Sequence, residues 1–467
     1  MCGINAIITD DNDGFFDLYE SLYHLQHRGQ DSFGLSYIDH NSQKIETRKY
    51  NTLLSSSNID MGTISDSIHI GIGHVRYPTS GKVTINECQP FYLEGKHFNI
   101  SFVHNGQIWI TESLKEFFKL NKITISETNT SDSIYLLHIL SFYINEYKTL
   151  TSDIIVDIVN KIQNLVQGSY NCICLIDNFG LICFKDQNSI RPLIYGGKKD
   201  NKSYIIASES VSITGIGYEI IDDIYGNDLL IFHKNKNQPL DKRILSSNSI
   251  FKPCIFEWVY LAREESTLYN VNVYRARLKL GEYLAHKIKD EIDISKIDYV
   301  VPVPDTSKPV ALSVSKILDI PYYECITKNR YVNRTFIMNT QKERGKNIKR
   351  KLNVIQEFIM NKNLLIIDDS IVRGNTMKHI IKLLKENGSN EIYVASSCPE
   401  IVNKNVYGID IPDKNELICH TLTNENICRE FNINHIIFQN LSDLKKSIQY
   451  FNQNINDFED SVFIKIS

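Results

Sequence analysis

The stretch Leu364-Leu365-Ile366-Ile367-Asp368-Asp369-Ser370-Ile371-Val372-Arg373-Gly374-Asn375-Thr376 decides how the second half of this 467-residue chain folds. It reads as an apolar strand, two carboxylates, a small polar loop and the start of a helix. Adjacent aspartates at a strand end suit Mg²⁺ or the hydroxyl groups of a sugar. Backbone N–H groups of the loop and of the first helical turn suit a phosphate. The stretch therefore predicts a phosphorylated-sugar site, and an ordinary strand–turn–helix with a solvated aspartate pair is the alternative.

The same rhythm extends outward from this stretch through the second half of the chain. Apolar strands are predicted at 298–303, 363–367, 391–396 and 435–438, with amphipathic helices between them. Such alternation predicts a parallel sheet covered on both faces, with ligands bound beyond the C-terminal strand ends. The second half is thus an α/β domain.

The first half has a different pattern, in which short alternating strands dominate. A helix is predicted over 15–25, and another over 131–144 with Ser131 as its N-cap. A polar stretch near 236–252 separates the two patterns. We therefore predict an α+β domain over 2–235 and the α/β domain, with a C-terminal tail, over 250–467.

The composition excludes several classes of protein. The chain holds 51 Lys and Arg and 55 Asp and Glu, a formal net charge of −4, which argues against a general nucleic-acid binder. No apolar run approaches the roughly 20 residues that a membrane helix needs, and the N-terminus lacks the pattern of a secretory signal. The ten cysteines are therefore expected to be reduced thiols of a cytoplasmic protein.

Cys2 stands where a cysteine can act as an N-terminal nucleophile. Removal of Met1 leaves the thiol beside a free α-amine, whose pKa of about 7.7–8.0 lets it act as a base near neutral pH. A chance Met-Cys start is the alternative. Four further segments supply polar groups in the same domain: His27-Arg28-Gly29-Gln30-Asp31, Gly73-His74-Val75-Arg76-Tyr77-Pro78-Thr79-Ser80-Gly81, His104-Asn105-Gly106 and Ser131-Asp132-Ser133.

These segments offer the groups that an amide-cleaving thiol needs. Arg76 can hold a substrate carboxylate through a two-pronged interaction, and Asp132 can pair with a substrate ammonium group. Asn105 and the Gly106 backbone N–H can form an oxyanion hole. Each feature alone has an ordinary explanation, such as a turn at Asn105-Gly106 or a surface charge at Arg76. Their presence together in a domain that begins with Cys favours the catalytic interpretation.

The motifs MCGI, HRGQD, GHVRYPTSG, HNG and SDS resemble those of the class II glutamine amidotransferases in order and spacing. The resemblance implies an αββα N-terminal-nucleophile hydrolase domain, in which Cys2 attacks the side-chain amide of glutamine and ammonia is released. Asn105 and Gly106 would stabilise the oxyanion. The residues implied to grip or shape the glutamine pocket are Arg28, Gly29, Arg76, Thr79 and Asp132.

Two further segments accompany the 364–376 stretch. Val303-Pro304-Asp305-Thr306-Ser307-Lys308 follows the first predicted strand of the second half, and residues 328–351 carry nine Lys or Arg and one acid, Glu343, for a charge of +8. A solvated loop or an RNA-binding segment is the alternative for 328–351, although few aromatic residues are interleaved for base stacking. A basic loop that is mobile until it folds over a pyrophosphate fits the segment better.

These three segments resemble the substrate motifs of type I phosphoribosyltransferases. The resemblance implies one Mg²⁺ ion per subunit, with Thr306, Asp368 and Asp369 as metal contacts. The residues implied to bind phosphoribosyl pyrophosphate are Ser307, Lys308, Lys328, Arg330, Arg334, Asp368, Asp369, Ser370, Arg373, Gly374, Asn375 and Thr376.

The combination of both halves resembles the amidophosphoribosyltransferase family over nearly the whole chain, with further matches at 188–193, 207–210, 256–263 and 407–410. The resemblance implies a glutamine-dependent glycosyltransferase that converts phosphoribosyl pyrophosphate to 5-phosphoribosylamine and releases glutamate and pyrophosphate. That reaction is the first committed step of purine nucleotide synthesis. Homo-oligomers (dimer or tetramer) and feedback inhibition by purine nucleotides are also implied, with no nucleic-acid or membrane partner.

The chain departs from the usual family pattern at Ser32, Phe33, Asn333 and Asn375. We expect Asn375 to act as a helix N-cap, so that backbone N–H groups still bind phosphate. Some family members carry a cleaved propeptide and a four-iron cluster. Met1 directly precedes Cys2, Asn405 stands at a cluster-ligand position and no C-x-x-C occurs, so we expect a cluster-free chain without a propeptide.

Two other functions remain open from the sequence. One is a different glutamine-dependent transferase, which makes an aminosugar or asparagine, and the 364–376 stretch argues against it. The other is a regulatory protein that binds phosphoribosyl pyrophosphate without turnover. The complete set of glutaminase motifs and the lack of a DNA-binding domain argue against that function.

Overall fold

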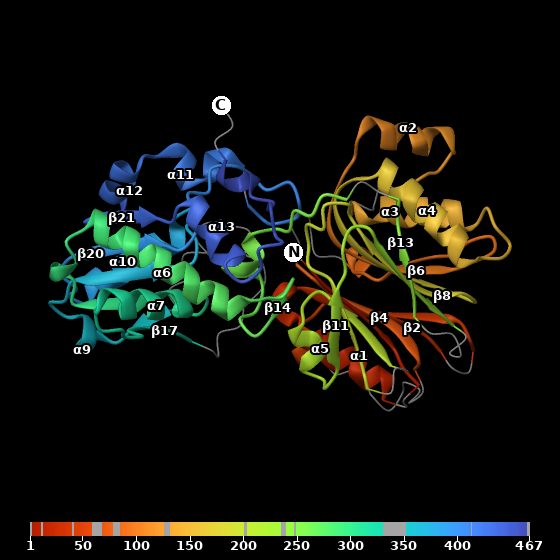
Figure 1. The fold of residues 1–467 in the computed structure, drawn as a ribbon, viewed down its shortest axis with the longest axis horizontal. Coiled ribbons are helices and arrows are strands. Elements are labelled where there is room, and N and C mark those ends of the chain that lie inside the picture. The colour runs from red at the N-terminus through yellow and green to blue at the C-terminus, as the bar shows by residue number, and fades with distance from the viewer. Residues whose placement is uncertain are drawn as a thin grey trace. The chain divides into compact units, whose positions relative to one another are not determined.

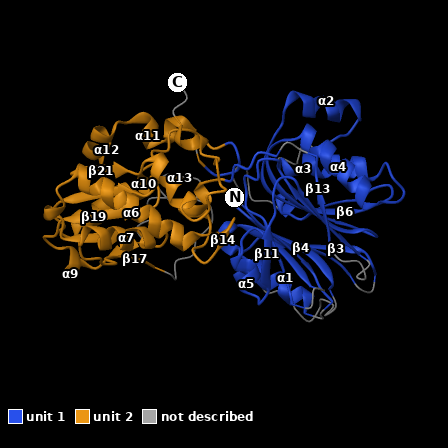
Figure 2. Cartoon of the chain, viewed as in Figure 1, with its two compact units in different colours: residues 1–253, 406–410 blue, residues 254–405, 411–467 orange. Residues whose placement is uncertain are grey.

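The computed structural model describes residues 2–10, 13–39, 42–57, 68–77, 85–125, 131–199, 203–234, 240–246, 249–329, 352–411 and 413–464. The chain divides into two compact units (Figure 2): unit 1 contains residues 1–253 and 406–410, and unit 2 contains residues 254–405 and 411–467. Residues 406–410, which the sequence analysis assigns to the second domain, thus group with unit 1. Among the helices of the described part, none is both long enough and apolar enough to cross a membrane.

Unit 1 contains two antiparallel sheets (Figure 1). The seven-stranded sheet has the order β11-β9-β10-β1-β4-β2-β3, and its strands are β1 (Gly3–Ile8), β2 (Ser32–Ile38), β3 (Ile45–Tyr50), β4 (Ile70–Arg76), β9 (Ile194–Gly197), β10 (Tyr204–Ala207) and β11 (Glu219–Asp223). The six-stranded sheet has the order β13-β12-β8-β7-β6-β5, and its strands are β5 (Phe91–Leu93), β6 (Ile100–Trp109), β7 (Gln167–Ile176), β8 (Gly180–Lys185), β12 (Asp228–His233) and β13 (Asp241–Ile244).

The two sheets pack face to face through alternating apolar residues. Ile4 and Ala6 of β1 join Val103 of β6 and Ile173 of β7 in one fully buried cluster. Since successive side chains of a strand point to opposite faces, this alternation gives each sheet an inner and an outer face. The packing also carries Cys2, just before β1, to the end of a central strand.

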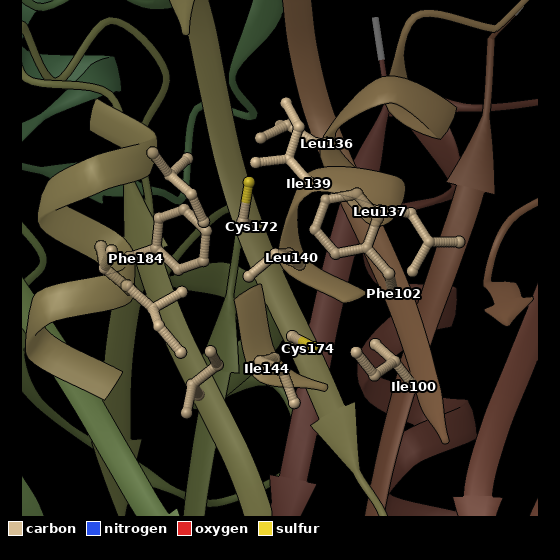
Figure 3. Close-up of a cluster of buried hydrophobic side chains, with 14 of the residues drawn as sticks. Ile100, Phe102, Leu136, Leu137, Ile139, Leu140, Ile144, Cys172, Cys174 and Phe184 are labelled. Carbon is tan, nitrogen blue, oxygen red and sulfur yellow. The ribbon is translucent and has the colours of Figure 1, made fainter. Parts of the chain in front are cut away.

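Helices cover the outer faces of both sheets. The helices beside the seven-stranded sheet are α1 (Gly14–Tyr23) and α5 (Val211–Thr214), and those beside the six-stranded sheet are α2 (Glu112–Leu120), α3 (Ser133–Ile144) and α4 (Ser152–Leu165). Figure 3 shows α3 side chains such as Leu140 and Ile144 gathered over Cys172 and Cys174 of β7 and Phe102 of β6. The layers run helix, sheet, sheet, helix, which confirms the predicted αββα fold of the first domain.

Unit 2 is built on a parallel sheet with the order β16-β19-β20-β21. Its strands are β16 (Tyr299–Pro302), β19 (Leu364–Asp368), β20 (Ile392–Ser396) and β21 (His435–Phe438). The helices are α6 (Val273–Glu291), α7 (Lys308–Leu318), α9 (Gln356–Ile359), α10 (Asn375–Glu386), α11 (Ile418–Thr421), α12 (Asn424–Phe431) and α13 (Leu441–Gln449). Two further sheets have two antiparallel strands each: β14 (Thr267–Leu268) pairs with β15 (Val271–Asn272), and β17 (Ile326–Lys328) pairs with β18 (Leu352–Val354).

Strand β19 shows why the sheet is covered on both sides. Leu365 and Ile367 join the cluster formed with α6 and α7, while Leu364 and Ile366 join the cluster formed with α10 and α12. All four side chains are fully buried. This double burial explains the continuous apolar run in the sequence, and it confirms the predicted parallel sheet.

Two predicted helix caps are wrong. Helix α3 begins at Ser133 with Asp132, not Ser131, at its cap position, and Asp132 makes no capping hydrogen bond there. Helix α10 begins at Asn375 itself, so Gly374 occupies the cap position with a φ of 76°. In both cases the tertiary structure decides which residue occupies the cap position, and the local preference for capping residues does not take that into account.

Candidate active sites

Cys2 lies at the junction of the two sheets of unit 1. It directly precedes β1 and is half-buried. Its backbone nitrogen lies 3.4 Å from Oδ1 of Asn105, which belongs to β6 of the other sheet. Among the other nine cysteines only Cys428 escapes full burial. Cys2 is therefore the accessible thiol of unit 1, and the fold brings it to the residue predicted to form the oxyanion hole.

Asn105 presents a buried donor to this site. The residue is 1% exposed, and its Nδ2 has no hydrogen-bond partner within the described part of the chain. A buried donor without an acceptor costs about 1–3 kcal/mol, so such a group is normally kept for a ligand. At the adjacent Gly106 (φ 154°), an added Cβ would lie 2.0 Å from the Ser169 carbonyl oxygen. Only glycine fits beside this amide.

The imidazole of His104, the residue before Asn105 on β6, is buried and hydrogen-bonded. Nδ1 of His104 lies 2.7 Å from the Ser133 hydroxyl, and the His104 backbone N–H donates to Oε1 of Gln89 (2.7 Å). Burial lowers the pKa of His104, so the ring is neutral near pH 7. His104 thus joins β6 to the first residue of α3 through a buried hydrogen bond.

Arg76 and Asp132, the predicted grips for the amino-acid end of glutamine, have partners inside the protein. Nη2 of Arg76, at the end of β4, lies 2.5 Å from Oε2 of Glu87. Oδ2 of Asp132 accepts from the backbone N–H of Ile108 (2.7 Å). The Arg76 guanidinium is therefore held by the carboxylate of Glu87. A glutamine substrate would offer a carboxylate to the same guanidinium. Thr79 lies outside the described residues.

Arg28 and Gly29 form part of the wall next to β4. Arg28 is buried, and its Nε donates to Oε1 of the fully buried Glu209. Nε2 of His27 lies 2.6 Å from the same oxygen. A Cβ on Gly29 would lie 2.4 Å from the Val75 carbonyl carbon, so a glycine is needed for the close approach to β4.

In unit 2, the loops after two neighbouring strands leave the sheet together. The Val303 N–H donates to the Ile367 carbonyl (2.8 Å), which joins the ends of β16 and β19. The segment with Thr306, Ser307 and Lys308 therefore begins beside the Asp368-Asp369 pair. This C-terminal edge is where parallel sheets bind their ligands.

Burial disfavours the ionised form of both aspartates of the pair. Burial first, and then the neighbouring charge of Asp369, raise the pKa of Asp368 well above its usual value. Desolvation raises the pKa of Asp369 to about 6, against the lowering effect of a hydrogen bond from Ser370 (2.8 Å) and of the Arg277 charge. Two carboxylates that resist ionisation together are suited to share a cation or a sugar hydroxyl.

The turn from β19 into α10 presents backbone donors. Lys378 donates to the Gly374 carbonyl (2.9 Å) as the first helical hydrogen bond, so the N–H groups of Asn375 and Thr376 have no partner within the helix. A Cβ on Gly374 would lie 2.7 Å from both Ile418 and Phe431. Nε of Arg373 donates to Glu416 (2.8 Å). The turn thus offers an anion the start of a twelve-residue helix.

The predicted lysines of the site pair with nearby acids. Nζ of Lys328 lies 3.1 Å from Asp305, and Nζ of Lys308 lies 2.8 Å from Glu324. The Ser307 hydroxyl donates to the Val303 carbonyl (2.5 Å), which leaves its backbone as the available contact. Arg330, Arg334 and the rest of 330–351 lie outside the described residues, so the prediction of a mobile basic loop stays a prediction.

Comparison with known proteins covers both units. The family model for the phosphoribosyl transferase domain matches residues 270–433. Amidophosphoribosyltransferases from Pasteurella multocida and Escherichia coli are 38% and 37% identical to this chain, with 99% of the chain and 92% of each relative covered. The enzyme of that name from Saccharomyces cerevisiae is 36% identical, with 99% and 91% covered. The chain belongs to the amidophosphoribosyltransferase family.

Solved structures agree with this assignment over the full length. The glutamine phosphoribosylpyrophosphate amidotransferase from B. subtilis, complexed with ADP and GMP, has a TM-score of 0.85 at 27% identity and covers 100% of this chain and 97% of its own. A structure described as the allosteric regulatory enzyme of purine biosynthesis has a TM-score of 0.86 at 27% identity, with 100% and 96% covered. The two-domain architecture is therefore that of the amidophosphoribosyltransferase family.

Several residues of this family member's site were not found by sequence reasoning. Glu87 and Glu209 hold Arg76 and Arg28. Glu87 lies in no motif, and Glu209 lies in the family match at 207–210, but nothing local links it to Arg28. Ser169 and the segment 406–410 contact β6 near Gly106, as described below. The match of 407–410 to the family was a usable signal, although nothing local linked it to unit 1.

Proposed function

We propose that this chain uses glutamine to convert phosphoribosyl pyrophosphate into 5-phosphoribosylamine, with release of glutamate and pyrophosphate. The similarity to amidophosphoribosyltransferases over 99% of the chain carries the proposal. This reaction is the first committed step of purine nucleotide synthesis. A transferase for an aminosugar or for asparagine would share the first unit but not the phosphoribosyl transferase domain of the second.

In the first half-reaction, the Cys2 sulfur attacks the side-chain carbonyl carbon of glutamine, and the α-amine freed by removal of Met1 takes the thiol proton. The oxygen becomes an oxyanion, for which Asn105 Nδ2 and the Gly106 N–H are the donors. The C–N bond of the amide then breaks. The Cys2 α-amine returns its proton to the departing nitrogen, which leaves as ammonia. Water then cleaves the thioester to glutamate. Two observations support these roles: Nδ2 of Asn105 is unpartnered, and Oδ1 of the same side chain lies 3.4 Å from the Cys2 nitrogen.

Arg76 and Asp132 are proposed to hold the carboxylate and ammonium groups of glutamine. For Arg76 this requires the substrate carboxylate to replace that of Glu87. The exchange is between like groups, so the guanidinium keeps a charge-assisted hydrogen bond throughout. Arg28, Gly29 and Thr79 would then shape the pocket without taking part in bond breaking.

In the second half-reaction, ammonia attacks C1 of phosphoribosyl pyrophosphate, and the C1–O bond to pyrophosphate breaks with inversion. Asp368 and Asp369 are proposed to hold the ribose hydroxyls. The N–H groups at the start of α10 would bind the 5-phosphate, while Lys308 and Lys328 face the pyrophosphate. Ammonia is itself a nucleophile, so no strong base is required.

The proposed metal at this site is Mg²⁺. The paired carboxylates of Asp368 and Asp369, with raised pKa values, fit a hard cation, and Thr306 adds an oxygen donor in the adjacent loop. Bound Mg²⁺ would neutralise negative charge on the departing pyrophosphate. The protein residues supply the anchoring and the orientation of the sugar.

Three further properties belong to the proposal. We expect the chain to be free of an iron–sulfur cluster, because it has no C-x-x-C and carries Asn405. We expect purine nucleotides to inhibit it and the chain to form homo-oligomers in the cytoplasm. The relative solved with ADP and GMP supports nucleotide regulation.

A pyrophosphate-release assay tests the proposed function. The purified chain is mixed with phosphoribosyl pyrophosphate and Mg²⁺, with glutamine or ammonium chloride as the nitrogen source. We expect pyrophosphate release with either source, and one glutamate per pyrophosphate with glutamine. Absence of release with both sources would contradict the proposal, and would favour a protein that binds the ligand without turnover.

A further inference from the structure

The segment Val406–Asp410 enters unit 1 from within the sequence of unit 2. Residues on both sides of it belong to unit 2, while its own contacts group it with unit 1 (Figure 2). There it lies against β6, the strand that carries Asn105 and Gly106. Nε1 of Trp109 donates to the Val406 carbonyl (2.9 Å), and the Trp109 and Tyr407 rings lie 5.4 Å apart. The segment is therefore anchored to β6 by hydrogen bonding and ring packing.

The carbonyl of Tyr407 links the segment to the peptide that follows Gly106. It accepts hydrogen bonds from the Ser169 hydroxyl (2.8 Å) and from Nη2 of Arg191 (2.7 Å), whose side chain is fully buried. Because the Ser169 hydroxyl donates to Tyr407, its oxygen is free to accept from the Gln107 N–H (3.2 Å). A relay thus runs from Tyr407 through Ser169 to Gln107.

Gly408 contacts the carbonyl end of the same peptide. A Cβ on Gly408 would lie 2.9 Å from the Gly106 carbonyl oxygen and 3.0 Å from its carbonyl carbon, and the φ of Gly408 is 92°. The two glycine backbones therefore pack directly on each other. The Gly106–Gln107 peptide is held at its N–H by Ser169 and at its carbonyl by Gly408.

An oxyanion hole works only if its donors are fixed before charge develops. Gly106 lacks a Cβ and sits at a φ of 154°, so its backbone rotates more readily than that of other residues. We propose that Ser169, together with Tyr407 and Gly408, positions Gly106 so that its N–H points at the oxyanion formed on glutamine. This inference rests on the proposed function and adds to it a positioning residue, Ser169, and a positioning segment.

The test compares Ser169→Ala with the wild-type chain. We expect kcat for glutamine hydrolysis to fall about tenfold or more, since small misplacements of catalytic groups cost up to about 10²-fold. The KM for glutamine should change less than about twofold, because ground-state binding does not use the oxyanion donors. Ammonia-dependent pyrophosphate release should keep its wild-type rate.

A second readout separates positioning from general loss of structure. The aldehyde analogue of glutamine, glutamate γ-semialdehyde, adds to a thiol as a thiohemiacetal whose oxygen occupies the oxyanion position. Its affinity should fall in Ser169→Ala by the same factor as kcat/KM, while inhibition by glutamate stays unchanged. Ser169→Thr keeps the hydroxyl and should restore both values.

Two further variants complete the design. Gly408→Ala places a methyl group against the Gly106 carbonyl and should give the same split between kcat and KM, which keeps the test available if Ser169→Ala does not fold. The control is Ser101→Ala. Ser101 lies on β6, as Gly106 does, and the substitution removes its buried hydrogen bond to Ser36 (2.7 Å). Both readouts should stay unchanged in this variant.

The outcomes distinguish this inference from the proposed function. Unchanged kcat and aldehyde affinity in both Ser169→Ala and Gly408→Ala, with an active wild type, would overturn the positioning role alone. An equal loss in the Ser101→Ala control would overturn it as well. A wild type that neither hydrolyses glutamine nor binds the aldehyde would instead overturn the proposed function.

Discussion

At the residue scale, the half-buried thiol of Cys2 and the unpartnered amide of Asn105 are the groups on which the glutamine reaction depends. The two residues come from different sheets, and both lie in unit 1. The aspartate pair of the second reaction lies in unit 2, at the end of β19. A substitution that abolishes the reaction at one site should therefore leave the reaction at the other site intact.

Cys2→Ser tests this separation. Serine is a far weaker nucleophile than a thiolate, so we expect glutamine-dependent synthesis to fall by at least about 10³-fold. Ammonia-dependent synthesis should continue when ammonium chloride is supplied at high pH. Loss of both activities in a variant with a wild-type circular dichroism spectrum would contradict the division of labour between the units.

The pKa of Asp369 predicts a pH dependence for the second site. Because the folded pKa is raised from 3.8 to about 6, the carboxylate becomes protonated as the pH falls through 6, and phosphoribosyl pyrophosphate should bind more weakly below that pH. The same shift means that this group's stabilising contribution is present at low pH and is lost as the pH rises from about 4 to 6.

Asp369→Asn checks the sign of this effect. It should raise the melting temperature at pH 8, where the carboxylate is charged and costly, and should change it little at pH 4. Transferase activity with ammonia should fall in the same variant. A lower melting temperature at pH 8 would show that the charge stabilises the free protein, contrary to this account.

At the element scale, the β19–α10 connection joins a buried strand to a helix whose first N–H groups lack helical partners. Its tight geometry depends on Gly374, which has a φ of 76° and packs against Ile418 and Phe431. The strand–turn–helix order was predictable from the sequence, because apolar run, polar turn and amphipathic helix follow each other directly. The exact cap residue was not, since Gly374 is fixed by residues of α11 and α12.

Gly374→Ala should disturb this turn selectively. A left-handed backbone and a Cβ 2.7 Å from two side chains both oppose alanine, so we expect a loss of about 1–3 kcal/mol in the free energy of unfolding. The KM for phosphoribosyl pyrophosphate should rise several-fold, whereas glutamine hydrolysis by unit 1 keeps its own KM. Unaltered phosphoribosyl pyrophosphate kinetics would argue that the turn does not bind the phosphate.

At the scale of the whole molecule, the local periods of the sequence predicted strands with one buried face in the first domain and a parallel sheet in the second, whereas the αββα arrangement of the first domain was implied by the resemblance of its motifs. Alternating residues such as Ile4 and Ala6 mark a sheet with one buried face, and the continuous run at 364–367 marks a sheet with two. Contacts that depend on the tertiary structure have no comparable pattern in the sequence. The Arg76–Glu87 pair and the grouping of residues 406–410 with unit 1 are examples.

The iron content of the whole chain provides a further prediction. A four-iron cluster needs four thiolates, and the chain has no C-x-x-C and carries Asn405 rather than a cysteine before Tyr407. We therefore expect a colourless protein with less than about 0.1 iron per chain when it is purified without oxygen. About four irons per chain, with visible absorbance, would contradict this expectation.

The central claim is that the amide nitrogen of glutamine ends on C1 of the ribose. The direct measurement uses glutamine labelled with ¹⁵N in its side-chain amide and phosphoribosyl pyrophosphate labelled with ¹³C at C1, followed by NMR during turnover. The account predicts a new C1 signal with one-bond ¹³C–¹⁵N coupling, and its loss in Cys2→Ser unless ¹⁵N-ammonium is supplied. Pyrophosphate release without that coupling, with C1 bonded only to oxygen, would contradict the account.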